Sequence, residues 1–328
     1  MAERAYSSEL GTMWFGDSLE VLTETPDSSV NAVITSPPFA LTRAKSYGNE
    51  PEHLYIEWFL KFATEVHRVL ADDGSFVIDL GGAWLPGSPT RSLYQYRLLL
   101  RLCDDLGFHL AEDFYWFNPA KLPGPREWVT KRRIRVKDSV NLVWWLSKSE
   151  HPKAHNSRVL VPYSKSMLQL IRKKSYNQGV RPSGHQVGEG WEKDLGGAIP
   201  SNVIRSVDES AQLDNFLEIA NTSSGDDYLK YCRDQSIPVH PARFPRALPE
   251  FFVRMLTEPG DIVLDPFAGS NMTGSIAEGL GRKWISCDTD LEFIRGSVGR
   301  FPNIDLTHFS TETVPAPLGS PAISQPGE

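Results

Sequence analysis

Two short segments of the chain combine residue types that could bind a ligand and modify it. The first is Thr35-Ser36-Pro37-Pro38-Phe39, which follows an apolar run. The two prolines remove two N–H donors and restrict the backbone, so carbonyl acceptors remain beside a hydroxyl group and an aromatic ring. This set suits a planar group with an exocyclic NH2, which donates two hydrogen bonds in its plane and can stack on Phe39. A proline-terminated strand with a packed Phe explains the segment alone equally well.

The second segment, from Asp265 to Gly274, reads Asp-Pro-Phe-Ala-Gly-Ser-Asn-Met-Thr-Gly. Glycine lets a ligand approach the backbone, and the start of a helix offers unpaired N–H groups. Asp288 follows 23 positions after Asp265, about where a nucleotide-binding fold places its ribose-binding acid. Asn271 replaces the second glycine of G-x-G-x-x-G, which argues against pyrophosphate and NAD and favours an adenosine without phosphate. The alternative is a purely structural turn between a strand and a helix.

Both segments need strands that end where their polar residues begin. Apolar runs predict strands over residues 12–15, 30–35, 75–80, 110–117, 140–146, 261–265 and 283–288. Helical spacing and turn residues predict helices over 19–23, 53–70, 92–106, 248–256 and 271–280. This alternation is typical of an α/β fold with a mostly parallel sheet. Periodicity is weak over 149–236, which we interpret as a separate, loop-rich unit.

Composition narrows the class of protein. The chain has 328 residues, of which 40% are hydrophobic and 23% are charged, so a disordered chain, a collagen and a coiled coil are excluded. No apolar run approaches the ~20 residues of a membrane-spanning helix, and the N-terminal residues lack the apolar stretch of a signal peptide. The three cysteines are widely spaced and predict neither a zinc site nor a disulfide framework, so we expect a reducing cytoplasm.

The net charge of -7 is distributed unevenly. Residues 121–181 contain 15 Lys and Arg and 3 Asp and Glu, a balance of +12, so the rest of the chain carries -19. A polyanion could dock on this middle segment. A solvated basic face is the alternative, and it is the commoner cause of such runs.

Taken together, the two segments resemble the amino-methyltransferases of DNA, and their order along the chain is similar to the β group of that family. Ser-Pro-Pro-Phe comes first and Asp-Pro-Phe-x-Gly-Ser far downstream. The resemblance covers most of residues 11–300. Further matching blocks are Gly16-Asp17-Ser18, Asp79-Leu80-Gly81-Gly82, residues 113–119 and residues 240–245.

The resemblance implies a fold and a division of the chain. The fold is a doubly wound, mostly parallel α/β sheet of the Rossmann-like, S-adenosylmethionine-dependent methyltransferase type. It is circularly permuted and carries a loop-rich DNA-recognition insert. The strand before Asp265 lies beside the strand before Ser36, so both segments open on one crevice. We expect a catalytic half over 1–148, a target-recognition region over 149–236, a cofactor-binding half over 237–304 and a disordered tail over 305–328.

The resemblance also implies residue roles. The catalytic positions are Ser36, Pro37, Pro38 and Phe39. Asp17 accepts from the adenine amine of the cofactor and Asp288 takes its ribose hydroxyls. The remaining cofactor positions are Asp265, Phe267, Gly269, Ser270 and Asn271 at the methionine end, and His240, Pro241, Ala242, Arg243 and Phe244 on the other side. Asn271 departs from the glycine of many relatives, but Asn also tolerates left-handed backbone.

For DNA, the resemblance implies phosphate contacts at Lys131, Arg132, Arg133 and Arg135. Trp116 is a candidate for packing near the extruded base, although a core aromatic explains it better. Base readout is expected from 149–236. No second ligand stands at metal spacing from His185 or His240, so we predict no metal site.

The implied activity is methyl transfer from S-adenosylmethionine to the N4 amine of cytosine in double-stranded DNA after base flipping. In the family, Ser at the first motif position goes with N4 of cytosine. Methylation at carbon-5 would need a cysteine nucleophile after a proline, and none is present. Adenine-N6 transfer, RNA methylation and a non-catalytic DNA-binding regulator remain alternatives. We expect a monomer in a type II restriction–modification system, where a cognate endonuclease would act on the same site without direct contact.

Overall fold

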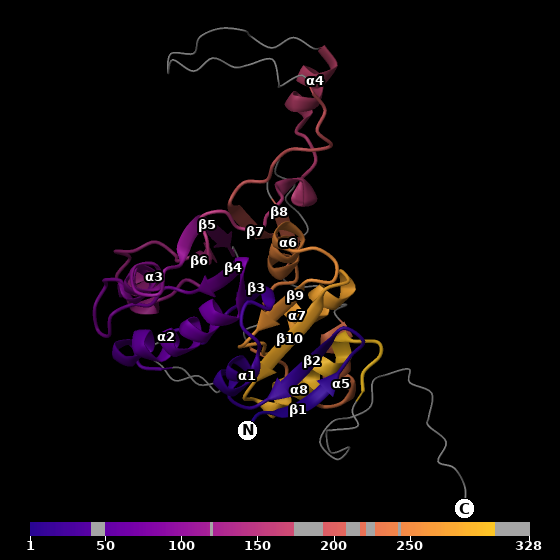
Figure 1. Ribbon diagram of the computed structural model, residues 1–328. Helices are drawn as coiled ribbons and strands as arrows, with labels where there is room; N and C mark the ends of the chain where they lie inside the picture. Colours follow the sequence, from indigo (N-terminus) through magenta and orange to yellow (C-terminus); the bar gives the residue numbers. More distant parts are fainter. Residues whose placement is uncertain are drawn as a thin grey trace, which may run out of the picture.

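A twisted sheet forms the centre of the computed structural model, and helices cover both of its faces (Figure 1). The structure describes residues 1–40, 50–118, 121–173, 193–207, 217–220, 227–241 and 244–305. Within them the strand order is β1-β2-β10-β9-β3-β4-β6-β5-β7-β8. The pairs β1/β2, β4/β6 and β5/β6 are antiparallel and the other neighbours are parallel. The predicted mostly parallel α/β sheet is therefore confirmed.

The elements follow the predicted alternation over much of the chain. The strands are β1 Glu3–Ser7, β2 Gly11–Phe15, β3 Val30–Thr35, β4 Leu70–Leu80, β5 His109–Phe117, β6 Val140–Ser147, β7 Val203–Val207, β8 Leu217–Ala220, β9 Ile262–Asp265 and β10 Lys283–Asp288. The α-helices are α1 Ser18–Glu24, α2 Glu52–Val69, α3 Tyr94–Asp104, α4 Lys165–Lys173, α5 Asp227–Asp234, α6 Ala247–Leu256, α7 Met272–Gly279 and α8 Leu291–Ser297. Shorter helical turns are η1 Glu127–Lys131, η2 Asn156–Val159 and η4 Val298–Arg300.

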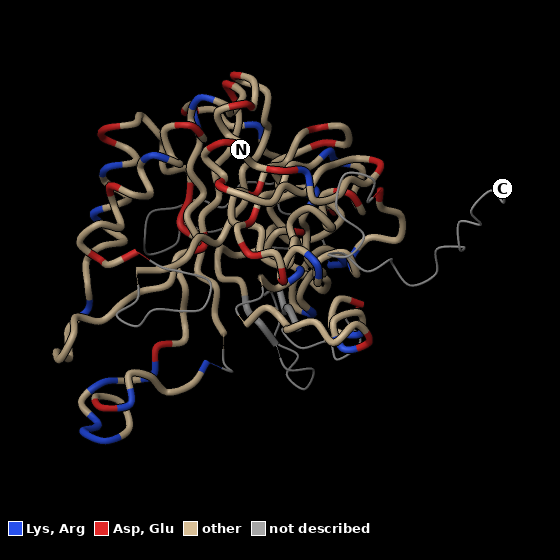
Figure 2. The backbone as a smooth tube through the Cα atoms, turned by 90° about the horizontal axis from the view of Figure 1, so that it is seen from below, with Lys and Arg blue, Asp and Glu red and all other residues tan. Residues whose placement is uncertain are grey.

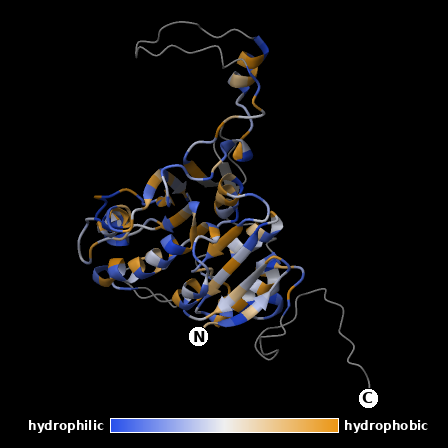
Figure 3. Ribbon diagram, in the orientation of Figure 1, coloured by the Kyte–Doolittle hydropathy of each residue, from blue (hydrophilic) through white to orange (hydrophobic). Residues whose placement is uncertain are grey.

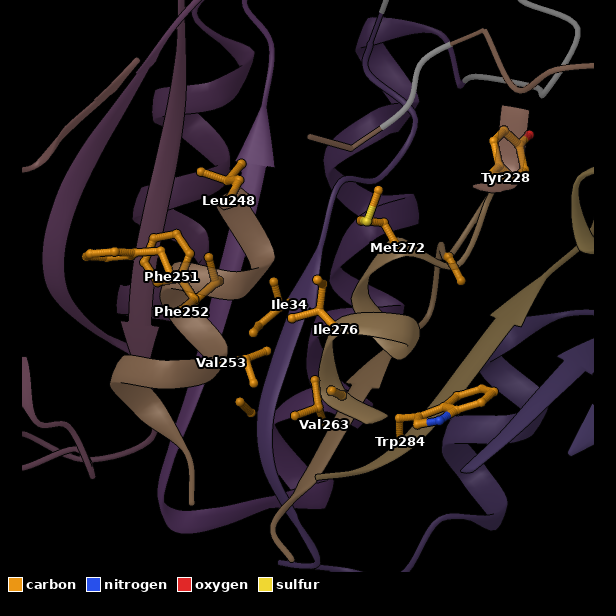
Figure 4. Close-up of a cluster of buried hydrophobic side chains, with 14 of the residues drawn as sticks. Ile34, Tyr228, Leu248, Phe251, Phe252, Val253, Val263, Met272, Ile276 and Trp284 are labelled. Atoms are coloured by element: carbon orange, nitrogen blue, oxygen red, sulfur yellow. The ribbon is translucent and has the colours of Figure 1, made fainter. Parts of the chain in front are cut away.

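Side chains of the central strands alternate between two hydrophobic cores, as the two-residue period of a strand requires. On β3, Ile34 points to the core beneath α5 to α8, whereas Val33 points to the core beneath α1 to α3. Figure 4 shows the first core, where Ile34 and Val263 of the sheet meet Ile276 of α7. Figure 3 shows hydrophobic residues both on these central strands and on the helices. Strands buried on both faces therefore appear in the sequence as continuous apolar runs.

The pairing of β3 with β9 joins the two halves of the chain. Ala32 lies opposite Val263 and Val33 opposite Leu264, in parallel register. Because parallel neighbours end at the same edge of a sheet, the residues after Thr35 and after Asp265 emerge side by side. The adjacency that the family resemblance implied is thus present.

The structure differs from the sequence prediction where β4 begins. The sequence predicted a helix over 53–70 and a strand over 75–80, with Asp72, Asp73 and Gly74 between them, but β4 starts at Leu70. Leu70 pairs with Val30 of β3, and the Gly74 carbonyl accepts from the amide of Lys148. The pairing of β3 with β4 skips residues 71–74, since Val30 lies opposite Leu70 and Ala32 opposite Ser75, so the expected turn residues form a bulge within β4.

Segment 149–236 is integrated with the rest of the molecule at several points. The strands β7 and β8 extend the catalytic sheet beyond β5, η2 packs against α6, and α5 packs against α8 and η4. Helix α4 stands off the body and has no buried residue (Figure 1). Of the predicted tail, Asp305 pairs with Ser7, and residues 306–328 lie outside the described residues. Within the described residues, every helix is too short or too polar to cross a membrane.

Candidate active site

A cavity of about 600 Å³ opens at the carboxyl ends of the central strands. Its walls come from both sequence segments, from the turn after β2 and from α2. The lining residues include Asp17, Ser36, Pro37, Pro38, Phe39, Glu50, Trp58, Lys61, His240, Phe244, Asp265, Phe267, Gly269, Ser270, Asp288 and Phe293. Most of the residues singled out in the sequence therefore share one cavity.

A direct hydrogen bond links the two segments. Thr35 Oγ1 donates to Asp265 Oδ1 at 2.6 Å across 230 positions of sequence. The same oxygen accepts from the amide of Phe267 at 3.1 Å, which holds the turn after β9. Burial raises the pKa of Asp265 to about 6 although these hydrogen bonds lower it. The buried Asp265 carboxyl group thus links the two motifs by hydrogen bonds at the cavity wall.

Ser36 lies at the start of a buried polar chain. Its Oγ donates to Asp79 Oδ2 at 3.0 Å, at the carboxyl end of β4. The other oxygen, Asp79 Oδ1, accepts from Asn141 Nδ2 at 3.2 Å, and Asn141 Oδ1 accepts from Lys121 Nζ at 2.8 Å. Asp79 is buried, and burial raises its pKa to about 6 while the hydrogen bonds and the charge of Lys121 lower it. Ser36 therefore faces the cavity with a carboxyl group behind it.

Phe39 lies against the backbone at the end of β4. A Cβ atom on Gly81 would lie 2.4 Å from the Phe39 ring, so a side chain at this position would displace the ring. The hydroxyl of Tyr94 donates to the carbonyl of Gly81, and Gln95 Nε2 donates to the carbonyl of Leu80 at 2.5 Å. Helix α3 thus holds the strand end on which Phe39 rests.

The turn after β9 wraps around a carboxyl group from β10. The amide of Gly269, which has a φ of +50°, donates to Asp288 Oδ2 at 2.6 Å. Asp288 Oδ1 accepts from the amide of Asp290 at 2.9 Å, and burial raises the pKa of this carboxyl to about 6. Each carboxylate oxygen has two lone pairs, so Asp288 retains acceptor sites toward the cavity. Its place at the end of β10 is the one expected for a ribose-binding acid.

The His240 side chain packs directly against this turn and also lines the cavity. A Cβ atom on Gly269 would lie 3.0 Å from His240 Nε2, so the glycine allows the ring to approach the backbone. The His240 ring meets Phe293 edge-on at 4.1 Å between centroids. On the far side, Arg300 Nε donates to the carbonyl of Ser270 at 2.6 Å. Phe293 and Arg300 had no signal in the sequence, because their roles depend on how α8 and η4 fold back on the turn.

Asn271 lies elsewhere than expected. It has left-handed backbone at φ 50° and ψ 45°, as anticipated, but its side chain is fully buried away from the cavity lining. Its Oδ1 accepts from the amide of Gly274 and from Ser286 Oγ, and its Nδ2 donates to the hydroxyl of Tyr6. These bonds begin α7 and join it to β10 and β1. The Asn271 side chain therefore stabilises the turn between β9 and α7 from the side that faces away from the cavity.

The remaining predicted cofactor positions are divided. Asp17 lines the cavity as the N-cap of α1, where its Oδ1 accepts from the amide of Leu19 at 3.0 Å. Phe244 is part of the lining, whereas Pro241 is exposed and is not part of it. Ala242 and Arg243 lie outside the described residues.

The cavity lining suits S-adenosylmethionine better than a phosphate-bearing dinucleotide. Among the described lining residues there are four acids and one lysine, so the field favours a cation such as a sulfonium or an ammonium group. Asp17 and Asp288 offer acceptors for an adenine amine and ribose hydroxyls. Phe267 adds apolar surface, backed by Trp58 at 5.7 Å between ring centroids. These residues fit the cofactor that the sequence implies.

The predicted DNA contacts lie on the connection between β5 and β6. Lys131 and Arg132 pair with Glu127 on η1, and Arg132 also lies over the ring of Trp128 at 4.9 Å. In Figure 2 this connection stands off the body as a coil rich in Lys and Arg. Arg133 and Arg135 are exposed on it. The basic residues therefore lie on a surface that a polyanion can reach.

Trp116 does not face this surface. It is 8% exposed and belongs to the core beneath α6, which favours the alternative that Trp116 is a core aromatic.

Asp79 is a site residue to which the sequence analysis assigned no role, although it belongs to the matching block Asp79-Leu80-Gly81-Gly82. The sequence feature that could have identified Asp79 as a site residue is its position as an acid at the end of the strand next to β3. Within the described residues, no group of three or more His, Cys, Asp or Glu side chains could hold a metal ion.

Comparison with known proteins now decides the family. Residues 30–298 match the family described as DNA methylase. The chain belongs to this family. The type II methyltransferase M.PvuII of Proteus hauseri is 52% identical over 90% of this chain and 85% of its own length. The solved PvuII DNA methyltransferase, described as cytosine-N4-specific, superposes on this DNA methylase with a TM-score of 0.71 at 46% identity, covering 92% of this chain and 89% of its own.

Two more distant relatives of this DNA methylase share most of its length. M.BglII of Bacillus subtilis is 25% identical over 87% of this chain and 67% of its own length. The DNA adenine methyltransferase YhdJ of Escherichia coli is 26% identical over 94% of this chain and 87% of its own. The Rossmann-like methyltransferase fold expected from the sequence is present, as the superposition on the solved PvuII DNA methyltransferase shows.

Proposed function

We propose that this DNA methylase transfers a methyl group from S-adenosylmethionine to the exocyclic N4 amine of a cytosine in duplex DNA. The observation that carries the proposal is the cavity that holds Ser36, backed by buried Asp79, together with the acidic turn at Asp265. The similarity to M.PvuII and to a cytosine-N4-specific structure supports N4 of cytosine and a type II modification role.

The cofactor is assigned to the side of the cavity made by the turns after β2, β9 and β10. Asp17 accepts from its adenine amine and Asp288 from its ribose hydroxyls. Phe267, Gly269 and Ser270 bound its methionine end. S-adenosylmethionine supplies a methyl group that is activated by the positive charge on sulfur. The acidic lining stabilises this charge, and His240 and Phe244 exclude water from the other side.

The target cytosine enters on the side of Ser36 to Phe39. Leaving the duplex costs a few kcal/mol, which stacking on Phe39 and hydrogen bonds to the amine offset in part. The amine is a weak nucleophile because its lone pair is conjugated with the ring. Ser36 Oγ and the Pro37 carbonyl each accept one N–H, which favours a pyramidal nitrogen. Alignment of this kind can lower a barrier by about 7–11 kcal/mol.

Asp79 gives the amine proton a destination. Because Ser36 Oγ donates its hydrogen to Asp79 Oδ2, its lone pairs remain free to accept from the amine. As the new N–C bond forms, the bond between the methyl carbon and the cofactor sulfur would break and leave its electron pair on a neutral thioether. One N–H proton would move to Ser36 Oγ, and the Ser36 proton to Asp79 Oδ2. With a pKa near 6, Asp79 is ionised at neutral pH yet more basic than an ordinary carboxylate. No covalent enzyme intermediate is needed.

Adenine-N6 transfer is the second candidate, because YhdJ, a DNA adenine methyltransferase, is similar over most of the chain. The same acceptors could hold either exocyclic amine, so geometry alone does not choose between the bases. We favour cytosine because the solved PvuII DNA methyltransferase, which is 46% identical to this chain, is described as cytosine-N4-specific.

We also propose the setting in which this activity operates. The enzyme acts as a monomer on each strand of bacterial DNA in the cytoplasm, where its cysteines stay reduced. Lys131, Arg132, Arg133 and Arg135 contact phosphates, and residues of 149–236 read the bases. A cognate endonuclease would act on the same site without contacting this chain.

Product analysis tests the proposal. The protein is incubated with labelled S-adenosylmethionine and mixed-sequence duplex DNA, the DNA is digested to nucleosides, and the labelled nucleoside is identified. Label in N4-methylcytosine, lost in Ser36→Ala, is the expected result. Label in N6-methyladenine would favour the second candidate. Label in RNA alone would contradict a DNA substrate, and label in neither nucleic acid would favour the non-catalytic alternative.

A further inference from the structure

The hydrogen-bond chain behind Ser36 extends beyond Asp79 to a lysine. Asp79 has a donor on each oxygen, Ser36 Oγ on one and Asn141 Nδ2 on the other. Asn141 in turn accepts at Oδ1 from Lys121 Nζ at 2.8 Å. Lys121 comes from the β5–β6 connection, Asn141 from β6 and Asp79 from β4. Three segments thus converge behind one catalytic hydroxyl.

Lys121 determines which end of the Asn141 amide faces Asp79. An ammonium group only donates hydrogen bonds, and an amide has one accepting end and one donating end. The oxygen of Asn141 must therefore face Lys121, which turns its NH2 group toward Asp79 Oδ1. An NH2 donor favours the ionised carboxylate, whereas an amide oxygen there would favour the protonated acid.

We propose that Lys121, acting through Asn141, is a positioning residue that keeps the Asp79 carboxyl ionised and directed at Ser36. This inference rests on the proposed function of the same site. Lys121 is thereby assigned to the support of Asp79 and not to a DNA phosphate, although it is the first residue of the basic segment.

The surrounding charges support this role. Burial and the charge of Arg91 lower the pKa of Lys121, while Asp138 and Asp79 raise it. Asp138 pairs with Arg91 at 2.9 Å, and Lys121 Nζ donates a hydrogen bond to Asn141 Oδ1 at 2.8 Å. Tyr94 faces Asp79 from α3, and burial raises its pKa far above neutrality, so it carries no charge. Among the described residues, Lys121 is the cation whose charge lowers the pKa of Asp79.

Removal of the ammonium group should therefore change the protonation of Asp79. In Lys121→Met the amide of Asn141 is free to reverse and present its oxygen to Asp79, and the stabilising charge is lost as well. The pKa of Asp79 then rises above about 6, so more of the enzyme is protonated at neutral pH. The rate should fall at pH 7 and recover at higher pH.

The pH profile of kcat is the first measurement, with DNA and cofactor saturating. Wild type should lose activity below about pH 6. In Lys121→Met this limb should move up by about one pH unit, which corresponds to a change of about tenfold in the protonation equilibrium. Lys121→Arg, which keeps a charged donor, should restore the wild-type limb. Lys131→Met, which removes an exposed lysine from the same connection, should raise the KM for DNA without moving the limb.

Infrared titration of the protein without ligands is the second measurement. The Asp79 carboxyl is assigned as the band that disappears in Asp79→Asn, and its midpoint should move up in Lys121→Met and Lys121→Gln. Unchanged midpoints in folded Lys121 variants, with an unshifted limb, would overturn the inference. If wild type transferred no methyl group to DNA, the proposed function would fail, and the infrared midpoints would still decide the role of Lys121.

Discussion

Ser36 and Asp79 share one proton path, so their contributions to the rate are not independent. We expect Ser36→Ala and Asp79→Asn each to lower kcat by about 10²–10⁴-fold, the range of general acid–base catalysis. Since either change interrupts the same path, the double variant should be little slower than the worse single variant. Single-turnover transfer of labelled methyl groups measures this.

The control for this comparison of single and double variants is cofactor affinity. It should stay within about twofold of wild type, because Ser36 lies on the substrate side of the cavity and Asp79 is buried behind it. If the fold losses in kcat of the two single variants multiplied in the double variant, this would contradict a shared proton path. It would indicate that the two residues contact the substrate separately.

The raised pKa of Asp288 predicts that cofactor binding in the absence of DNA depends on pH. Its pKa is raised to about 6, so it is ionised at pH 7.5 and takes up a proton as the pH falls through 6. Protonation removes negative charge and an acceptor, so the Kd for S-adenosylmethionine should rise between pH 7.5 and 5, by about tenfold for each pH unit below the pKa at most. Calorimetric titration without DNA measures this.

Asp288→Asn should bind the cofactor weakly at pH 7.5 and lose much of this pH dependence. Glu20→Gln, which changes an exposed acid of α1 beside the cavity, is the matched control and should behave as wild type. Part of the dependence should persist in Asp288→Asn, since the pKa of Asp265 is raised to a similar value. A full wild-type dependence in that variant would assign it to another group.

At the scale of elements, the end of β4 limits where Phe39 can lie. Gly81→Ala would place a methyl group 2.4 Å from the ring, so Phe39 must move. We expect unfolding to become easier by about 1–3 kcal/mol and kcat/KM for DNA to fall more than cofactor affinity does. Denaturant unfolding and steady-state kinetics measure the two effects.

Gly279→Ala is the matched control for this change. Its Cβ would meet nothing within 4 Å, and it lies in the last turn of α7. This variant should be as stable as wild type or slightly more stable, since alanine favours the helix by up to about 1 kcal/mol. Equal effects of the two substitutions would show that the contact with Phe39 does not matter.

At the scale of the whole molecule, charge is separated between an acidic body and a basic middle segment. Each phosphate contact that is lost should reduce the slope of log K against log salt by about 0.9. Replacing Lys131, Arg132, Arg133 and Arg135 by Met or Gln should therefore flatten the salt dependence of DNA binding and leave cofactor affinity unchanged. Fluorescence anisotropy over a salt series measures the slope.

Lys230→Met, an exposed lysine on α5, is the control for that series and should keep the wild-type slope. A wild-type slope in the variant that lacks all four basic residues would place the DNA on another surface, with α4 as the next candidate because it carries Arg172 and Lys173.

Much of the site could be predicted because its residues stand in short contiguous motifs. The apolar runs before Ser36 and Asp265 are buried on both faces of the sheet, so their strand character was visible without a structure. Glycine and proline marked the turns that follow. The left-handed backbone of Asn271 was likewise anticipated from its residue type.

Contacts between distant segments could not be predicted in this way. Asn271 was assigned to the cofactor, yet its amide is satisfied by Gly274, Ser286 and Tyr6, and the last of these comes from the other end of the chain. The strands β7 and β8 were missed because they complete a sheet edge whose partner, β5, lies far away in sequence. Such pairing has no local pattern.

The sequence by itself determined the strands that are continuous apolar runs, the two turns and the chemistry that each turn can perform, because these depend on residue type and on spacing within one segment. Only the tertiary structure decided that Thr35 meets Asp265 and that Ser36 is backed by Asp79, Asn141 and Lys121. The reason is physical: a buried hydrogen bond between distant residues depends on strand order and register, and these are set by packing the whole sheet.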